Sequence, residues 1–347
     1  MTSRLWPRVG IVLGIVVVVA TFAFVLPRIA DYGQVWSVVK GLTWKQVFVL
    51  ALATLVNLVT FAPPWMAALP RLGFRRAFVV TQASTASTYV APGGAAVGVA
   101  LSYAMLRGWG LPARSVALAE ALTGVWNQLA LLGFPVIALA LLTLQKEQNA
   151  LLQTVAAIGL AVFVVAAGGF AVGLSTPQLA LRVGDGAARL VNRILGVLRR
   201  KPVGWTGDSF VRFRNEAVGL LRRRWHVLTL ATLAGQLSVF LVLLVSLRVL
   251  GVSASEVSGV EAFASWSIVR LLGSLPITPG GLGVVEIGLT AALVGFGGHN
   301  AEVVAAVLLY RFLTIVPTLV LGLAAGATWG RLRRVWDDDR QAADTDG

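Results

Sequence analysis

The chain has 347 residues, of which 57% are hydrophobic and only 13% are charged. Apolar runs recur along its whole length, which excludes an ordinary soluble domain and predicts a polytopic membrane protein. The formal net charge of +14 does not indicate nucleic-acid binding, because Lys and Arg gather in loops between apolar segments, where they orient the chain and contact anionic lipid. The lack of cysteine excludes disulfides, thiolate metal sites and cysteine nucleophiles.

Six apolar stretches are long enough to cross a hydrocarbon core of about 30 Å as helices. They lie near residues 9–26, 46–66, 115–144, 150–174, 226–250 and 301–328. The first follows Arg4 and Arg8 like a secretory signal, but it is long and no Ala-x-Ala cleavage site follows it, so we expect a retained span. The predicted fold is therefore all-α, with six full crossings.

Two further apolar segments, 76–106 and 258–296, are each interrupted by Pro-Gly-Gly. The breaks are Pro92-Gly93-Gly94 and Pro279-Gly280-Gly281. Such a break frees backbone amides and carbonyls, which are tolerated at membrane depth only where protein or an aqueous cavity surrounds them. We expect each segment to form a broken re-entrant hairpin of helix, turn and helix beside a buried site.

The distribution of basic residues predicts the orientation. If each broken segment enters and leaves the membrane on the same side, every Arg-rich loop falls on one face, which is then the cytoplasmic face. That face holds both termini and the 176–224 loop with its eleven Lys and Arg residues. We therefore expect a multi-pass protein of the plasma membrane with both termini in the cytoplasm.

The two breaks lie 187 residues apart, at Pro92 and Pro279, and other features coincide at the same offset. Gly110 meets Gly297, and the span at 46–66 falls on 233–253, so each unit reads as crossing, broken hairpin and crossing. In the orientation above, the two hairpins enter from opposite faces, which predicts the inverted repeat typical of alternating-access transporters. The alternative is that each Pro-Gly-Gly is only a tight turn.

The pattern divides the chain into four parts. Residues 1–177 hold the first span and first repeat, and 225–330 hold the inverted second repeat. Between them, 178–224 is predicted to be a basic amphipathic linker that lies on anionic membrane lipid. The tail, 331–347, is basic and then acidic, and we expect it to be disordered.

Four of the ionisable residues within the predicted spans and hairpins stand out: Glu120, Arg270, Glu286 and Arg311. Each costs about 2.5 to 3.5 kcal/mol to insert at membrane depth, which makes them candidates for function. Arg270, Glu286 and Arg311 are expected to meet in one cavity. Alternatively, Glu286 and Arg311 form a buried ion pair that only locks the bundle. Glu120 either belongs to the site, pairs with Arg114 or reaches the membrane interface.

The helices that begin after the breaks indicate an anionic ligand. Their first amides are unpaired and carry the positive end of the helix dipole, and glycine lets a phosphate approach the backbone closely. No metal or other cofactor is expected, since neither His226 nor His299 has metal-ligand spacing. The predicted substrate-binding residues are Pro92, Gly93, Gly94, Glu120, Arg270, Pro279, Gly280, Gly281, Gly283, Glu286 and Arg311.

Uncharged polar residues lie in the same segments. They are expected to line the cavity or to form interhelical hydrogen bonds. These residues are Asn57, Gln82, Asn127, Gln128 and Gln236.

The run Leu275 to Glu286, with its Pro-Gly-Gly-Leu-Gly-Val-Val-Glu core, resembles the flippase-like family found as the membrane portion of lysylphosphatidylglycerol synthetases. The likeness covers roughly 9–328, and Pro92-Gly93-Gly94 with Tyr103 and Arg107 fits its first-half pattern. The resemblance implies translocation of a phospholipid or lipid-linked phosphate, with Glu286 and Arg311 as site positions. The soluble aminoacyl-transferring domain of fused members is absent from this sequence, so lysyl transfer is not expected.

The sequence thus predicts a lipid translocase that moves an anionic lipid between leaflets by alternating access. No Walker-type loop occurs, so the drive is expected to be a gradient or mass action. One alternative is a membrane-embedded enzyme acting on a polyprenyl-phosphate or phospholipid substrate, but no Asp lies near either break and we expect no enzyme activity. A scaffold or a small-ion channel is a third reading, and a homo-oligomer is left open.

Overall fold

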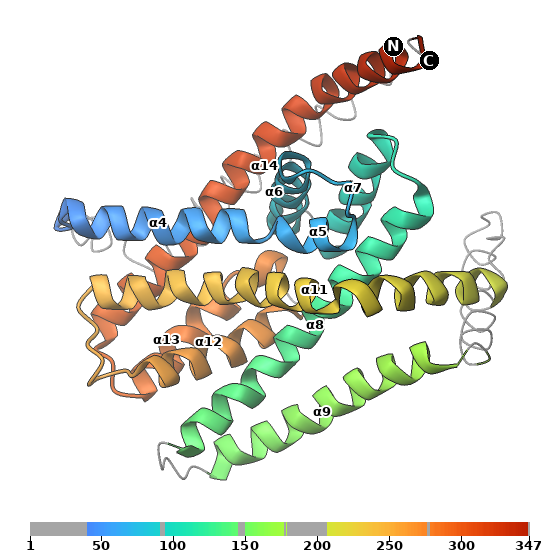
Figure 1. Cartoon of the computed structure of the whole chain (residues 1–347). Coiled ribbons are helices and arrows are strands. Elements are labelled where there is room, and N and C mark those ends of the chain that lie inside the picture. Colours follow the sequence, from blue (N-terminus) through green and yellow to red (C-terminus); the bar gives the residue numbers. More distant parts are fainter. Residues whose placement is uncertain are drawn as a thin grey trace.

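The computed structural model describes residues 40–90, 94–144, 150–176, 178, 207–275 and 278–345. Within these ranges the chain is helical and contains no strand (Figure 1). The elements are α4 (Trp44–Thr60), α5 (Pro63–Ala68), α6 (Phe74–Val90), α7 (Gly94–Gly108), α8 (Ala113–Leu144), α9 (Ala150–Ser175), α11 (Gly207–Val249), α12 (Gly259–Gly273), the 3₁₀ turn η3 (Pro279–Gly281), α13 (Val284–Gly295) and α14 (Asn300–Thr345).

Five helical segments in the described part of the chain are long and apolar enough to cross a membrane. They are Trp44–Ala68, Ala113–Leu144, Ala157–Ser175, Val211–Val249 and Asn300–Gly326. They correspond to five of the six predicted spans, and the sixth, 9–26, lies outside the described residues. The chain is accordingly a helical multi-pass membrane protein.

Two helices begin at capping boxes that the sequence encodes locally. At α4 the backbone N–H of Gln46 donates to Thr43 Oγ1 (3.4 Å), and the backbone N–H of Thr43 donates to the side-chain oxygen Oε1 of Gln46 (2.8 Å). At α12 the same reciprocal pair joins Ser258 and Glu261. Each box satisfies amides that would otherwise lack a partner in the first helical turn.

Two helices extend further than the sequence predicts. The end of the predicted basic linker, from Gly207 onward, is continuous with the following span, and together they form the 43-residue α11. The tail that was expected to be disordered is helical as far as Thr345, at the end of α14. Residues 331–345 contain neither Gly nor Pro, so nothing in their backbone interrupts a helix that is already nucleated. Residues 178–200 of the predicted linker, apart from Gln178, lie outside the described residues.

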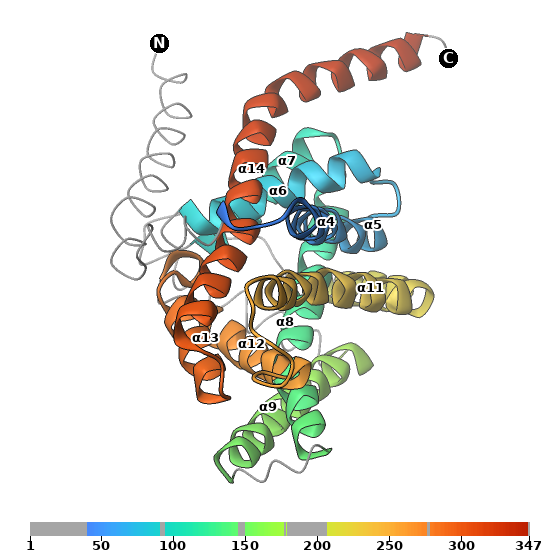
Figure 2. The ribbon, with the colours of Figure 1, turned by 90° about the vertical axis from the view of Figure 1, so that its left-hand side faces the viewer.

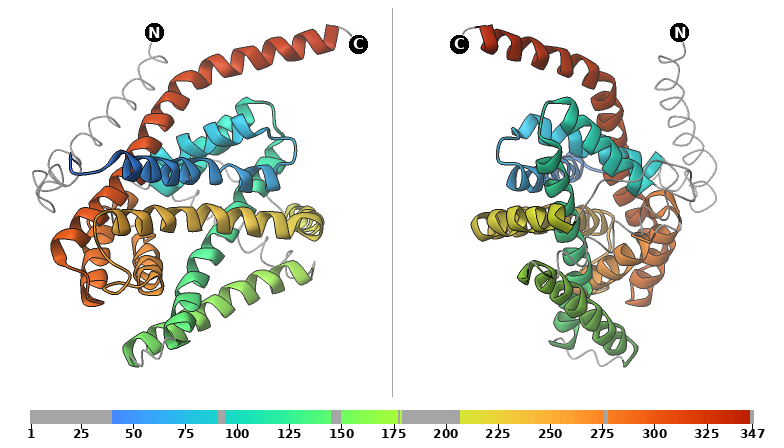
Figure 3. Two further views of the ribbon diagram at one scale, coloured as in Figure 1. Left: turned by 60° about the vertical axis from the view of Figure 1, so that its left-hand side comes forward. Right: turned by 90° about the vertical axis from the view of Figure 1, so that its right-hand side faces the viewer.

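The helices form a bundle in which α4 packs against α11, and α8 contacts α9, α11 and α12 (Figure 2). The last part of α14 extends beyond the other helices. Helix α9 lies on the outside along α8 (Figure 3), and none of its apolar span is buried inside the protein. Its side chains, such as Val165 at 74% exposure, are placed to contact lipid.

Each of the two apolar segments with a Pro-Gly-Gly break contains two helices that pack against each other. The first pair is α6 with α7, whose junction at 91–93 lies outside the described residues, and the second is α12 with α13, joined through η3. Each leading helix also packs against a long helix from the other half of the chain: α6 against α14, and α12 against α8. The two halves are therefore interlocked and do not form separate bodies.

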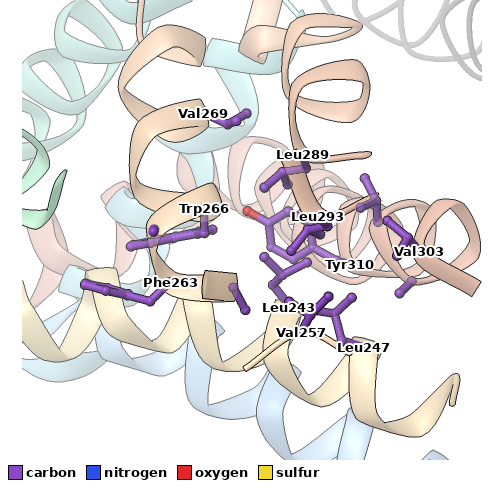
Figure 4. Close-up of a cluster of buried hydrophobic side chains, with 14 of the residues drawn as sticks. Leu243, Leu247, Val257, Phe263, Trp266, Val269, Leu289, Leu293, Val303 and Tyr310 are labelled. Atoms are coloured by element: carbon purple, nitrogen blue, oxygen red, sulfur yellow. The ribbon is translucent and has the colours of Figure 1, made fainter. Parts of the chain in front are cut away.

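An apolar cluster fixes the second hairpin in the bundle. The rings of Phe134 on α8 and Phe240 on α11 meet Phe263 of α12 edge to face, with centroids 5.7 and 5.1 Å apart. Figure 4 shows Trp266 and Val269 of α12 beside leucines of α11 and α13 and Tyr310 of α14. Four helices thus bury one continuous core around α12.

Helices α7 and α13 end with the same backbone pattern at the offset of 187 residues. Gly110 and Gly297 have positive φ angles of 77° and 117°, which glycine adopts without strain. The next amide in each case donates to a carbonyl five residues earlier, closing a Schellman motif. These bonds join Leu111 to Leu106 (3.3 Å) and Gly298 to Leu293 (3.1 Å).

The contact between α6 and α14 depends on a glycine. A Cβ at Gly322 would overlap the Ala86 side chain and lie 2.6 Å from the Gln82 carbonyl oxygen, whereas a Cβ at Gly326, one turn later, meets open space. We predict that Gly322→Ala lowers the free energy of unfolding by about 1 to 3 kcal/mol through overpacking. Thermal unfolding in detergent measures this, with Gly326→Ala as the matched control that retains full stability. Equal melting temperatures for the two variants would contradict the close approach.

Candidate functional site

A cavity of about 410 Å³ lies among the membrane-spanning helices and the first hairpin. Its size is within the range of small-molecule sites. Most of the residues that line it have polar side chains, and apolar residues such as Phe61, Trp65 and Val239 complete the wall. The charged ones are Glu120, Arg270 and Arg311. The amides are Asn57, Gln82, Asn127 and Gln236. The aliphatic hydroxyls are Thr81, Ser84, Thr85, Thr88, Thr123, Thr232, Thr314 and Thr318.

One wall of the cavity is held by a buried ion pair. Arg311 Nε on α14 lies 2.6 Å from Glu286 Oε1 on α13, and the two side chains are 7% and 3% exposed. Arg311 Nη2 also donates to the Gly280 carbonyl (3.0 Å), and Glu286 Oε2 accepts from the Gly283 amide (2.7 Å). The pair therefore binds both ends of the second Pro-Gly-Gly turn, as well as joining two helices. Its burial is tolerated because both charges have close partners.

The second turn, Pro279 to Gly283, has a backbone that requires glycine. Gly280, Gly281 and Gly283 have φ angles of 59°, 67° and 83°, in the left-handed region. A side chain at Gly280 would also overlap the ring of Tyr89, which lies at the end of α6. The second break is thus packed against the helix that leads into the first one.

The first break is described only in part. Pro92 and Gly93 lie outside the described residues, and Gly94 is the first residue of α7. A Cβ at Gly94 would lie 2.6 Å from Thr88 Cα, so the chain turns back tightly on the end of α6.

Glu286 changes the role expected for the start of α13. The sequence predicts free amides there for an anion, but the Gly283 amide is taken by the carboxylate of Glu286, three residues later. A carboxylate at this position completes a helix start from within the chain. The Gly283 amide is therefore unavailable to a ligand.

Arg270 differs from Arg311 in what surrounds it. Its Nε donates to Gln236 Oε1 (3.1 Å), and its Cζ lies 5.5 Å from the centroid of the Trp266 ring. Gln236 is fixed in turn by a hydrogen bond to Asn127. In the described part of the chain, no carboxylate lies within salt-bridge distance of Arg270 and its two terminal nitrogens have no hydrogen-bond partner. This guanidinium is held in place yet open to an anion.

Glu120 also lines the cavity, and it accepts a hydrogen bond from Ser102 of α7. The alternative pairing with Arg114 is wrong, because Arg114 Nε bonds Glu216 Oε2 of α11 instead (2.8 Å). Six residues along a helix turn the side chain to another face, so these two cannot meet.

The uncharged amides were predicted either to line the cavity or to form interhelical hydrogen bonds, and four of the five do both. Asn57, Gln82, Asn127 and Gln236 line the cavity. They also form interhelical bonds, such as Gln82 Nε2 to the Leu58 carbonyl (3.0 Å). Gln128 is exposed and is not part of the wall, since it lies about 100° around α8 from Asn127.

Sequence reasoning missed the hydroxyls of α6. Residues 81–89 read Thr-Gln-Ala-Ser-Thr-Ala-Ser-Thr-Tyr, and four of the five aliphatic hydroxyl residues face the cavity. The available signal was the polarity of this run within a segment expected at membrane depth, where polar groups require partners.

Comparison with known families gives one result. Residues 11–322 match the profile of a family described as the lysylphosphatidylglycerol synthase TM region. This match confirms the resemblance inferred from the run at 275–286. None of the curated proteins compared with the chain matches it.

The buried ion pair should dominate local stability. We predict that Glu286→Gln or Arg311→Gln alone lowers the free energy of unfolding by about 3 to 5 kcal/mol, because each leaves a buried charge without its partner. The double variant should lose less than the sum of the two. Denaturant unfolding in detergent provides the values.

The exposed pair of Arg114 and Glu216 serves as the control for this experiment. Glu216→Gln should cost less than about 1 kcal/mol, since exposed ion pairs contribute little. An equal cost for Glu216→Gln and Glu286→Gln would show that burial does not govern the pair.

Proposed function

The chain belongs to the lysylphosphatidylglycerol synthase TM region family, and on that premise we propose that it translocates an anionic phospholipid or lipid-linked phosphate between leaflets. The observation that carries the proposal is Arg270, an arginine with open terminal nitrogens in a polar cavity among membrane-spanning helices. A charged group at this depth has a large insertion cost, which favours a role in binding. The lipid's charged head occupies the cavity while its acyl chains remain in the bilayer.

Arg270 suits a phosphate because the guanidinium presents parallel N–H groups that bind two phosphate oxygens at once. Gln236 and the Trp266 ring hold it in one orientation, so little side-chain entropy is lost when an anion binds. Arg311 adds positive charge to the same cavity but already serves Glu286 and Gly280. Arg270 thus binds the anion, and Arg311 supports the structure of the site.

The proposed mode of transport is alternating access. It requires that the six crossings and two broken hairpins form an inverted repeat. Two observations support it: the shared helix ends of α7 and α13 at the offset of 187 residues, and the reciprocal packing of α6 on α14 and α12 on α8. The contact of Tyr89 with Gly280 joins the two hairpins beside the cavity. Rocking of one half against the other about this contact exposes the cavity to each leaflet in turn.

The proposal includes a location and an energy source. The protein lies in the plasma membrane with both termini in the cytoplasm, and the basic linker at 178–224 contacts anionic lipid there. Transport is driven by a gradient or by mass action, and the lipid leaves chemically unchanged, so the protein is not an enzyme.

Inversion of the repeat is tested by the loops that follow the two hairpins. Pro112 and His299 are equivalent at the offset of 187 residues, and both are exposed. The chain has no cysteine of its own, so Pro112→Cys and His299→Cys give single labelling sites. We predict that a membrane-impermeant maleimide labels His299→Cys in intact cells and Pro112→Cys only after permeabilisation. Labelling of both from one side would exclude the inverted arrangement.

Translocation is tested in proteoliposomes that contain acyl-labelled phosphatidylglycerol, with dithionite reporting the outer leaflet. We predict protein-dependent transfer that Arg270→Gln slows roughly ten- to hundredfold, the effect of losing charge-assisted hydrogen bonds of about 1.5 to 3 kcal/mol. Arg114→Gln, the same change in the exposed pair, should retain the full rate. Equal rates for both variants, or no transfer above empty vesicles, would refute the proposal. Mass spectrometry of the recovered lipid distinguishes transport from chemical modification.

A further inference from the structure

The cavity wall has an unusual balance of hydrogen-bond groups. Each Ser or Thr hydroxyl has one proton, and a helical hydroxyl often donates it to a carbonyl three or four residues earlier. Six hydroxyls of the wall do so, which leaves their oxygens able only to accept. They are Thr81, Ser84, Thr88, Thr123, Thr314 and Thr318.

Two amide side chains of the wall add further acceptors. The nitrogens of Asn57 and Gln82 donate to Ser238 and to the Leu58 carbonyl, and their oxygens accept no hydrogen bond from the described part of the chain. Gln236 differs, because its oxygen accepts from Arg270 and its nitrogen donates to Asn127. Gln82 Oε1 is buried with no hydrogen-bond partner in the described part of the chain, and the side chain of Gln82 is only 3% exposed. Thr232 Oγ1, from 5% exposed Thr232, also has no partner there, and as a hydroxyl it can either donate or accept.

This inventory constrains the headgroup. A phosphate oxygen is itself an acceptor, so it binds Arg270 but finds no complement in the six hydroxyl oxygens whose protons are already donated within their own helices. Hydrogen-bond donors are what these oxygens lack. The cavity volume of about 410 Å³ lies in the range that holds small organic molecules, which leaves room for a group beyond the phosphate.

Two kinds of headgroup carry donors: those with several hydroxyls and those with an ammonium. An ammonium concentrates its donors and its charge at one point, which a carboxylate matches best. Most acceptors of the described wall are uncharged oxygens, and its one carboxylate, Glu120, accepts from Ser102 through Oε1. The acceptors are instead spread over three helices, which matches the spread hydroxyls of a polyol or sugar.

We propose that the cavity selects lipids whose phosphate carries a polyhydroxylated headgroup. The phosphate binds Arg270, and the headgroup hydroxyls donate to the oxygens of Gln82, Thr88 and Thr123 and their neighbours. This inference rests on the proposed function for the presence of a lipid and adds the class of its headgroup. It makes the hydroxyl-rich face of α6 the determinant of specificity.

The experiment compares three acyl-labelled lipids with identical chains in the proteoliposome assay. Phosphatidylinositol and phosphatidylmethanol carry the same single negative charge, but only the first has headgroup hydroxyls. Phosphatidylethanolamine supplies ammonium donors. We expect phosphatidylinositol to move at least tenfold faster than the other two. Equal rates for phosphatidylinositol and phosphatidylmethanol overturn the headgroup inference while leaving translocation intact. A rate for phosphatidylethanolamine that equals that of phosphatidylinositol overturns it as well, because donors of any kind then suffice.

A matched pair of variants assigns the selectivity to the wall. Thr123→Val removes an acceptor from the cavity at nearly constant volume, and we combine it with Thr88→Val on α6. Thr143→Val, at the exposed end of α8, removes a hydroxyl that also donates within its own helix but lies away from the cavity. The double variant should slow phosphatidylinositol five- to tenfold and leave phosphatidylmethanol unchanged, whereas Thr143→Val should change neither. A uniform slowing of both lipids by the double variant contradicts selection by these hydroxyls.

Lipid retention separates failure of this inference from failure of the proposed function. The protein is purified from vesicles that contain equal amounts of phosphatidylinositol and phosphatidylmethanol, and the retained lipid is quantified by mass spectrometry. If neither lipid is translocated, the proposed function fails, yet enrichment of phosphatidylinositol still supports the headgroup class. Equal retention overturns it.

Discussion

The buried pair of Arg311 and Glu286 is the constraint on which the rest of the site depends. At membrane depth neither charge is tolerated alone, so each side chain is fixed by the other. Because both also bind the backbone of the second Pro-Gly-Gly turn, the pair determines the path of that turn as well as the spacing of α13 and α14. A glycine-rich break with few side chains thereby acquires a defined shape.

That shape has a consequence for the second arginine. With Glu286 committed to Arg311, no described carboxylate reaches Arg270, whose terminal nitrogens remain open in the same cavity. Two arginines close in the fold therefore have different roles, one closing a structural network and the other facing the space beside it. Hydroxyl oxygens of Thr88 on α6, Thr123 on α8 and Thr314 on α14 line the same space as acceptors.

The packing of the helices explains how such a polar space persists in an apolar bundle. Each broken hairpin is held by a long helix of the other half, and the ring cluster around Phe263 buries the apolar face of α12 away from the cavity. Close approaches at Gly322 and Gly280 bring α14 and η3 against α6. The outer helix α9 takes no part in this and faces lipid along its span.

The sequence by itself determined the membrane class, the five described spans, the division of both hairpin segments into two helices and the family, because length, hydropathy and the Pro-Gly-Gly pattern are local properties. It also brought Arg270, Glu286 and Arg311 together as candidates. Only the tertiary structure decided which arginine is paired, that Arg114 meets Glu216 and not Glu120, and that the hydroxyls of α6 line the cavity. These outcomes depend on how helices distant in the chain are rotated against one another, and periodicity within a single helix does not specify that rotation.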